Sequence, residues 1–325
     1  MTHWVHPQVT ARLAEFCDPL VPSAEQGVWS RDELLARAAD AVGLVSCMAD
    51  CVDEALLAAC PRVRVVAAVA KGTENIDVAA CARCGVWVTN LPELLTAPTA
   101  ELVLGLLLAL LRRIVDADAS VRRGGFTGWR PSFYGTSLAG ATVGIIGMGQ
   151  LGQAVARRVG AFEADVVWHD PAPASPMDAA AHGARAVSLP ALLADSDVVV
   201  PLVPLTATTE GLFDAAALEA MRPGAFLVNA GRGSVVDEDA VADALESGRL
   251  GGYAADVFAF EDWRSPDRPR TIPQRLLTNP RTVFTPHLGS AVATVRQAMG
   301  LAAAEQLRQA LAGQRPDYAV NEATG

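Results

Sequence analysis

Short apolar runs alternate with segments of helical periodicity along most of this 325-residue chain. Apolar runs bounded by Gly, Pro or polar residues are typical of buried strands, and strands that alternate with helices indicate an α/β fold. We therefore expect a doubly wound parallel sheet in one domain and a second, smaller flavodoxin-like α/β domain. The predicted strands are residues 41–46, 63–70, 86–88, 143–146, 164–168, 198–202, 225–229, 252–257 and 283–285.

Helical patterns lie between and after these strands and set the expected domain boundaries. The clearest are residues 31–39, 53–59, 98–113, 150–159 and 291–312. The long apolar helix at 98–113 is placed to join two domains, and the helix at 291–312 is placed to return to the first. The sequence thus predicts a discontinuous first domain, residues 1–97 and 291–325, and a second domain at 98–290.

The second domain opens with a glycine motif that indicates a nucleotide site. Gly147, Gly149 and Gly152 form G-x-G-x-x-G directly after a predicted strand and at the start of a predicted helix. This layout is typical of a dinucleotide-binding βαβ unit, in which the helix N-terminus binds the phosphates. The next predicted strand is followed by Asp170, whose carboxylate can accept hydrogen bonds from both ribose hydroxyls and would repel a 2′-phosphate. We therefore expect a Rossmann domain that prefers NAD to NADP.

Charge and composition narrow the class of partner. The chain has 26 Lys and Arg against 36 Asp and Glu, a net charge of −10, and 51% of its residues are hydrophobic. A negative net charge argues against nucleic acid and anionic membranes as partners. It also requires an anionic substrate to be bound by a local group of cations.

The N-terminal sequence and the cysteines bear on the compartment. The first residues lack the basic start and apolar core of a signal peptide, and the apolar stretch at 102–111 is too short to cross a bilayer. We expect a cytoplasmic protein. Cys81-x-x-Cys84 is compatible with a redox pair or half a zinc site, but no second pair accompanies it, so reduced thiols and no metal are favoured.

Three polar residues each follow a predicted strand of the second domain, at the sheet edge where doubly wound folds bind ligands. They are Arg232, Glu261 and His287. Singly, such residues are more often capping or solvated loop residues, so the prediction rests on their common position. We expect His287 to handle a proton, Glu261 to hold the imidazole and Arg232 to bind substrate oxygens. Asp256 is expected to bind the nicotinamide amide.

The chain resembles the D-2-hydroxyacid dehydrogenase superfamily over nearly its whole length. The matching motifs are the glycine turn, Pro204–Thr209, Asn229-Ala-Gly-Arg232-Gly, Asp256-Val-Phe-x-x-Glu261 and Thr285-Pro-His287-Leu-Gly. The resemblance implies NAD as cofactor and Arg232, Glu261 and His287 as the catalytic residues. It also implies cofactor contacts from Thr99, Gly147, Gly149, Gln150, Leu151, Gly152, Asp170, Pro171, Pro204, Thr209, Ala230, Arg232, Asp256 and His287.

Within the superfamily the chain is most similar to the phosphonate dehydrogenases, which oxidise phosphite to phosphate with NAD. The similarity lies in Ala70-Lys71-Gly72 and in residues 128–136, 261–270 and 290–296. It implies substrate contacts from Lys71, Gly72, Met48 and Arg296. The chain departs from the pattern at Glu74, at Ala259 and at Asp170-Pro171, and none of these changes removes a catalytic group.

The charges of the predicted substrate residues agree with the resemblance to phosphonate dehydrogenases. Two other functions stay open. Phosphite is largely a dianion near neutral pH, so Lys71, Arg232 and Arg296 would match it better than they match a 2-hydroxy acid with one negative charge. The first alternative is a 2-hydroxyacid dehydrogenase of the glyoxylate or hydroxypyruvate reductase type. The second is an NAD-sensing, corepressor-like binding module. We also expect a homodimer, with residues 102–111 and the aromatic segment 126–134 as a candidate interface, and we expect that segment to be ordered and packed.

Overall fold

The computed structural model describes residues 1–172, 183–263, 265 and 267–323, and these residues form two compact units. The small unit comprises Met1–Leu95, Trp263–Pro266 and Ser290–Gly325. The large unit comprises Thr96–Asp262 and Asp267–Gly289. Both units contain a parallel sheet covered by helices, so the predicted α/β fold with two domains is confirmed.

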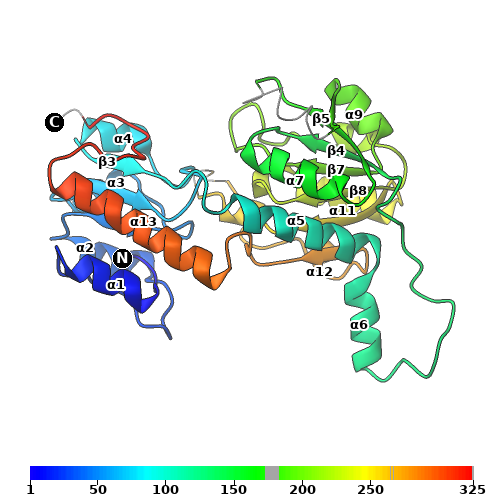
Figure 1. Cartoon of the computed structure of the whole chain (residues 1–325), viewed down its shortest axis with the longest axis horizontal. Helices are drawn as coiled ribbons and strands as arrows, with labels where there is room; N and C mark the ends of the chain where they lie inside the picture. Colours follow the sequence, from blue (N-terminus) through cyan, green and yellow to red (C-terminus); the bar gives the residue numbers. More distant parts are fainter. Residues whose placement is uncertain (173–182, 264, 266, 324–325) are drawn as a thin grey trace. The chain divides into compact units, whose positions relative to one another are not determined.

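The small unit is built on a three-stranded parallel sheet in the order β1-β2-β3. Its strands are β1 (Leu44–Ser46), β2 (Val65–Ala68) and β3 (Trp87–Thr89). Its helices are α1 (Pro7–Ala14), α2 (Arg31–Ala38), α3 (Glu54–Ala59), α4 (Val78–Arg83) and α13 (Ala293–Leu311). The C-terminal helix α13 packs with α1 against β2 (Figure 1), so the end of the chain completes the hydrophobic core of the first unit.

The large unit is built on a seven-stranded parallel sheet in the order β10-β9-β8-β7-β4-β5-β6. Its strands are β4 (Thr142–Ile146), β5 (Asp165–His169), β6 (Arg185–Ala186), β7 (Val198–Pro201), β8 (Ala225–Asn229), β9 (Leu250–Ala255) and β10 (Thr282–Phe284). The strand order reverses between β4 and β7. In doubly wound sheets, ligands bind at the carboxyl ends of the strands at this switch point.

Helices cover both faces of the large sheet. They are α5 (Thr96–Leu111), α7 (Gln150–Gly160), α9 (Leu189–Asp195), α10 (Ala215–Ala220), α11 (Glu238–Glu246) and α12 (Gln274–Leu277), with the 3₁₀ turns η1 (Gly233–Val235) and η2 (Ala259–Glu261). Because side chains alternate along a strand, Val198 and Val200 face one apolar cluster while Val199 faces the other. Strands buried on both faces read as continuous apolar runs, which explains why these strands were readily predicted.

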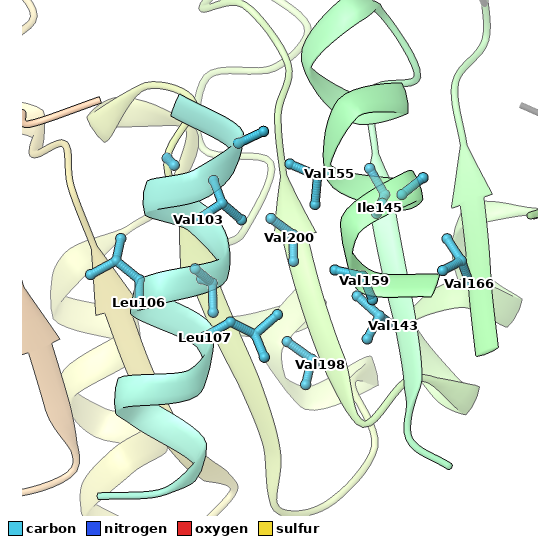
Figure 2. Packing of buried hydrophobic residues seen from close by; sticks show 14 of the residues in the cluster. Val103, Leu106, Leu107, Val143, Ile145, Val155, Val159, Val166, Val198 and Val200 are labelled. Carbon is cyan, nitrogen blue, oxygen red and sulfur yellow. The ribbon is translucent and has the colours of Figure 1, made fainter. Parts of the chain in front are cut away.

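Two helices lie side by side on one face of this sheet. Figure 2 shows their apolar side chains meeting those of β4 and β7. The contributing residues are Val103, Leu106 and Leu107 of α5, Val155 and Val159 of α7, Val143 and Ile145 of β4, and Val198 and Val200 of β7. Burying one such side chain stabilises the fold by roughly 1.5–3 kcal/mol. The apolar stretch at 102–111 therefore contributes to the core of its own unit.

The segment after α5 behaves differently from the prediction. Helix α6 (Ile114–Arg122) buries no residue, and the aromatic loop that follows it extends away from the sheet (Figure 1). Trp129 is 84% exposed and Tyr134 is 76% exposed. The expectation that this aromatic segment is packed within the chain is wrong. Among the described residues, no helix has both the length and the apolarity needed for a membrane span.

Candidate active site

The backbone geometry of the glycine turn in the large unit explains why glycine occupies these positions. Gly147 has φ +95°, and a Cβ there would meet the carbonyl oxygen of Leu202 at 2.8 Å. A Cβ at Gly152 would lie 2.1 Å from the carbonyl oxygen of Gly147, so only glycine lets α7 approach β4 this closely. No atom lies within 4 Å of the Cβ position of Gly149, which leaves that face open to a ligand.

Helix α7 begins directly after this turn, and its N-terminus fits the pyrophosphate of NAD. Its N-cap, Gly149, has no side chain to cap the first turn, and a glycine-capped helix N-terminus of this kind is typical of phosphate-binding turns. Asp170 follows β5, and its Oδ2 accepts a hydrogen bond from the Met148 N–H at 2.8 Å. Its Oδ1 accepts from the Ala172 N–H at 2.8 Å. Each oxygen keeps a second lone pair for a ribose hydroxyl, so Asp170 can hold the turn and the cofactor together.

His287 and Glu261 form a hydrogen-bonded pair. Nδ1 of His287 lies 2.6 Å from Oε2 of Glu261, and both side chains are partly exposed. A carboxylate can only accept here, so Nδ1 donates and Nε2 is left to take or give a proton. His287 also has φ +56°, a left-handed conformation that a residue with a side chain adopts at a cost. The structure thus places the predicted base and its orienting acid in contact.

Asp256 supports this pair from the core. Its Oδ1 accepts from the Thr285 hydroxyl at 2.6 Å and from the Leu288 N–H at 2.7 Å, and its Oδ2 accepts from the Gly289 N–H at 2.9 Å. The side chain is only 2% exposed, and burial raises the pKa of Asp256. The structure therefore gives Asp256 the task of fixing the loop that carries His287. Its predicted bond to the nicotinamide amide stays a prediction.

Arg232 lies beyond the end of β8, at the N-cap of η1. Its Nη1 donates to the Gly231 carbonyl at 2.7 Å, and its own carbonyl accepts from Nδ2 of Asn229 at 2.9 Å. A Cβ at Gly233 would lie 1.9 Å from the carbonyl carbon of Phe258, so η1 and η2 pack backbone to backbone. This glycine brings the turn of Arg232 against the turn of Glu261, a signal in the Gly-Arg-Gly motif that the sequence argument did not use.

The other predicted cofactor residues lie around the same edge of the large sheet. Gln150 and Leu151 open α7, Pro171 follows Asp170, and Ala230 follows β8. Thr99 is buried near the start of α5, and its side chain lies beside Gly289. The hydroxyl of Thr209 donates to the Pro204 carbonyl at 2.6 Å and closes the loop after β7. Their cofactor contacts stay predictions.

The small unit carries the predicted substrate residues Met48, Lys71, Gly72 and Arg296. Met48 follows β1 and Lys71 follows β2, and these strands pair in parallel, so both loops leave the same edge. Asn75 ties the loops together, because its Nδ2 donates to the carbonyls of Cys47 at 2.9 Å and Asp50 at 2.7 Å. The backbone of Lys71 is fixed by Nδ2 of Asn90, which donates to its carbonyl at 2.7 Å. The Lys71 side chain is half-buried.

Arg296 is half-buried near the start of α13, beside Cys47, and burial lowers its pKa. Within the described part of the chain it forms no ion pair. Its hydrogen-bond partners are the Ser290 hydroxyl and Nε2 of His3, each at 3.5 Å. A guanidinium only donates, so Nε2 of His3 accepts and the ring carries its proton on Nδ1.

His3 is a functional candidate that the sequence argument missed. It is buried, and burial, helped by the positive charges of Arg296 and the Met1 amino group, lowers the pKa of His3 to about 3. Its Nδ1 lies 3.4 Å from the Thr2 hydroxyl, which donates to Asp50 at 2.5 Å. His3 is therefore uncharged at neutral pH and orients Arg296 without neutralising it. Because His3 and Arg296 are 293 positions apart in the sequence, no local pattern indicates this contact.

Metal chemistry has no visible site among the described residues, where no group of three or more His, Cys, Asp or Glu could hold an ion. The six cysteines are free thiols. Cys81 is buried on α4, and burial raises its pKa to about 12, which keeps it protonated. Of the segment 261–270 that entered the resemblance, Arg264 and Pro266 lie outside the described residues.

Comparison with known proteins now decides the family. Residues 104–289 match the model of the D-isomer specific 2-hydroxyacid dehydrogenase, NAD binding domain. The chain belongs to the D-2-hydroxyacid dehydrogenase family. Its large unit is therefore an NAD-binding domain, and the predicted cofactor is confirmed at this level.

Individual relatives are consistent with this family but carry different names. The chain is 42% identical over 295 residues to a D-3-phosphoglycerate dehydrogenase of Mycobacterium tuberculosis, covering 91% of this chain and 54% of that protein. It is 34% identical to a glyoxylate reductase of Thermofilum pendens, covering 95% and 90%. The crystal structure of the TT0316 protein from Thermus thermophilus has a TM-score of 0.86 at 35% identity, with 98% of both chains covered. This chain thus spans about half the length of the first curated relatives that it matches.

Proposed function

We propose that this protein is an NAD-dependent dehydrogenase that oxidises phosphite to phosphate. The observation that carries the proposal is Arg296, a half-buried guanidinium oriented by an uncharged histidine and with no ion pair in the described chain. A desolvated cation is costly unless an anion completes it. With Lys71 in the same unit and Arg232 in the other, the chain offers three cations to its substrate. A dianion needs more of them than a single carboxylate does.

The residues of this chain supply binding and proton handling for that reaction. Bound NAD supplies the acceptor for a hydride. At the substrate, the P–H bond breaks with its electron pair leaving as hydride, and a bond forms from phosphorus to a water oxygen. Lys71, Arg232 and Arg296 bind the phosphite oxygens and the added negative charge. Nε2 of His287, held by Glu261, takes the proton that water loses, or stays protonated as an electrostatic partner while solvent takes it.

A second candidate is reduction of glyoxylate or hydroxypyruvate, and the names of the relatives favour it. The glyoxylate reductase of Thermofilum pendens matches over almost the whole of both chains. In this reaction Arg232 would bind the substrate carboxylate, and protonated His287 would donate to the carbonyl oxygen that the hydride turns into an alcohol. In this reaction the substrate carries one negative charge, so Lys71 and Arg296 are needed less for binding.

One absorbance assay separates the candidates. NADH is followed with phosphite, D-lactate and D-glycerate in the presence of NAD, and with glyoxylate and hydroxypyruvate in the presence of NADH. We expect NADH to form with phosphite. If phosphite is inert while glyoxylate is reduced briskly, the protein is a 2-hydroxyacid dehydrogenase. If no substrate reacts although NAD binds, the corepressor-like binding module is favoured.

We also propose that two copies associate through residues 112–137, the segment formed by α6 and the aromatic loop. Its support is the exposure of three large aromatic side chains, Phe126, Trp129 and Tyr134, within one short segment. Sedimentation velocity should give a dimer for the wild type and a monomer for a Trp129→Ala, Tyr134→Ala variant. The variant Phe162→Ala, which removes an exposed aromatic outside this segment, is the control. A monomeric wild type would contradict the proposal.

A further inference from the structure

Glu238 is a buried acid that the proposed reaction does not use. It is the first residue of α11, and its side chain is only 6% exposed. Instead of facing solvent, its Oε1 accepts a hydrogen bond from the Ala259 N–H at 2.8 Å. Ala259 begins η2, the 3₁₀ turn whose last residue is Glu261. The acid is thus bonded to the backbone that presents the partner of His287.

Two carboxylates accept hydrogen bonds from adjacent N–H groups at the start of this turn. Glu238 accepts from Ala259, and Glu261 itself accepts through Oε1 from the Phe258 N–H at 2.8 Å. The other oxygen of Glu261 is the one that meets Nδ1 of His287. A short 3₁₀ turn has few internal hydrogen bonds, so the loss of an outside acceptor leaves its first N–H groups unpaired. Any tilt of η2 moves Oε2 of Glu261 relative to the imidazole.

The surroundings of Glu238 favour its protonated form. Its Oε2 is buried and has no hydrogen-bond partner among the described residues. The same is true of the hydroxyl of the fully buried Tyr253. The pKa of Glu238 is raised to about 7, mainly by burial and to a smaller extent by the negative charges of Asp239, Asp262 and Glu261, although the hydrogen bond from Ala259 lowers it. The positive charge of Arg232 acts on Asp262, one of these acids. If Oε2 of Glu238 carries a proton, Oε1 can still accept the hydrogen bond from Ala259, and no further negative charge lies beside Glu261.

We propose that Glu238 is a positioning residue for the Glu261–His287 pair: as a buried acid bonded to the backbone of η2, it fixes this turn and so the carboxylate that orients the imidazole. It touches neither substrate nor cofactor and acts through Glu261. This role rests on the proposed dehydrogenase activity, since the pair is useful only if His287 handles a proton. The hydrogen bond to Ala259 itself is independent of any substrate.

The test compares Glu238→Gln with Glu238→Ala. Gln keeps an oxygen acceptor for Ala259 and cannot ionise, so its kcat should stay within about twofold of the wild type. Ala removes the acceptor, so kcat should fall about tenfold with KM nearly unchanged, because a misplaced Glu261 acts on chemistry and not on binding. Glu246→Ala, which removes an exposed carboxylate at the other end of α11, is the matched control and should leave kcat unchanged.

A double-mutant cycle tells positioning from general destabilisation. If Glu238 acts through Glu261, adding Glu238→Ala to Glu261→Gln should cost less than twofold, although it costs tenfold alone. Equal losses in both backgrounds, or a Glu238→Ala variant that melts lower but keeps its full kcat, would overturn the proposal. So would a loss in Glu238→Gln as large as that in Glu238→Ala.

A measurement without substrate keeps the inference separate from the choice of reaction. Infrared difference spectra between pH 5 and pH 9 should show the C=O band of a protonated carboxyl that is lost near pH 7 in the wild type and is missing in Glu238→Gln. If this band is present and the assay panel shows no turnover, the proposed function has failed while the buried acid stands. If the band is missing in the wild type, Glu238 is ionised and the inference is wrong.

Discussion

The two units differ in how their candidate functional residues are paired. In the large unit, His287 is hydrogen-bonded to Glu261, and the loop that carries His287 is fixed by the buried Asp256. In the small unit, Arg296 has a neutral histidine where an ion-pair partner would be expected, and no carboxylate pairs with it in the described chain. A paired histidine is suited to move a proton, whereas an uncompensated arginine is suited to bind an anion. We therefore propose that the large unit handles the proton and that Arg296 of the small unit contributes to anion binding.

The largest loss of activity should follow from removing the histidine that handles the proton. His287→Asn removes the group that takes or gives a proton, so we expect kcat to fall by about 10² to 10⁴ with little change in NAD affinity. Steady-state kinetics and quenching of protein fluorescence by NAD measure the two quantities. A kcat within tenfold of the wild type would show that the Glu261–His287 pair is not catalytic.

Removing one of the three cations tests whether they bind an anionic substrate. Lys71→Ala should lower kcat/KM for phosphite by roughly 10- to 100-fold, the usual loss for a charge-assisted hydrogen bond. Lys71→Arg keeps the charge and serves as the control. The activity with a monoanionic substrate such as D-lactate, if the assay panel finds any, should fall much less. Equal losses for both substrates would show that the cations do not distinguish a dianion from a monoanion.

The comparison can be sharpened at His3, where a charge can be added in place of a neutral acceptor. His3→Glu puts a carboxylate beside Arg296, so an internal ion pair should compete with the substrate and raise KM about tenfold. His3→Gln keeps an uncharged acceptor, and its KM should stay within about twofold of the wild type. Melting temperatures of both variants show whether the fold is intact. An unchanged KM in a folded His3→Glu variant would separate Arg296 from substrate binding.

The last prediction concerns the pH dependence of stability and not the rate of the reaction. Glu238 has a pKa of about 7 in the fold against an ordinary value of 4.5, so the folded state holds its proton more tightly than the unfolded state. Its stabilising contribution is therefore full below about pH 4.5 and is lost as pH rises through 7, a change of up to about 3 kcal/mol. Denaturant unfolding at pH 5 and pH 8 should show that Glu238→Gln gains stability over the wild type at the higher pH. An equal difference at both pH values would contradict this.

The sequence predicted those features whose signals are local. Buried strands such as β4 and β7 read as continuous apolar runs, and the glycine turn has a fixed spacing, so both were located within a few residues. Helix α11 was missed although Asp237 caps its N-terminus, because it is short and most of its apolar residues are alanines. The aromatic loop was misjudged, since aromatic side chains indicate burial without saying against what. His3 and Glu238 gave no signal, because their partners lie far away in the sequence.

The most direct test of anion binding by fixed cations is a crystal structure of the protein with NAD and sulfite, a shape mimic of phosphite. We expect the sulfite oxygens to lie within hydrogen-bond distance of Arg296, with the ammonium of Lys71 directed at them and His3 still accepting from the guanidinium. A structure in which Lys71 points into bulk solvent and Arg296 binds no anion would contradict the account.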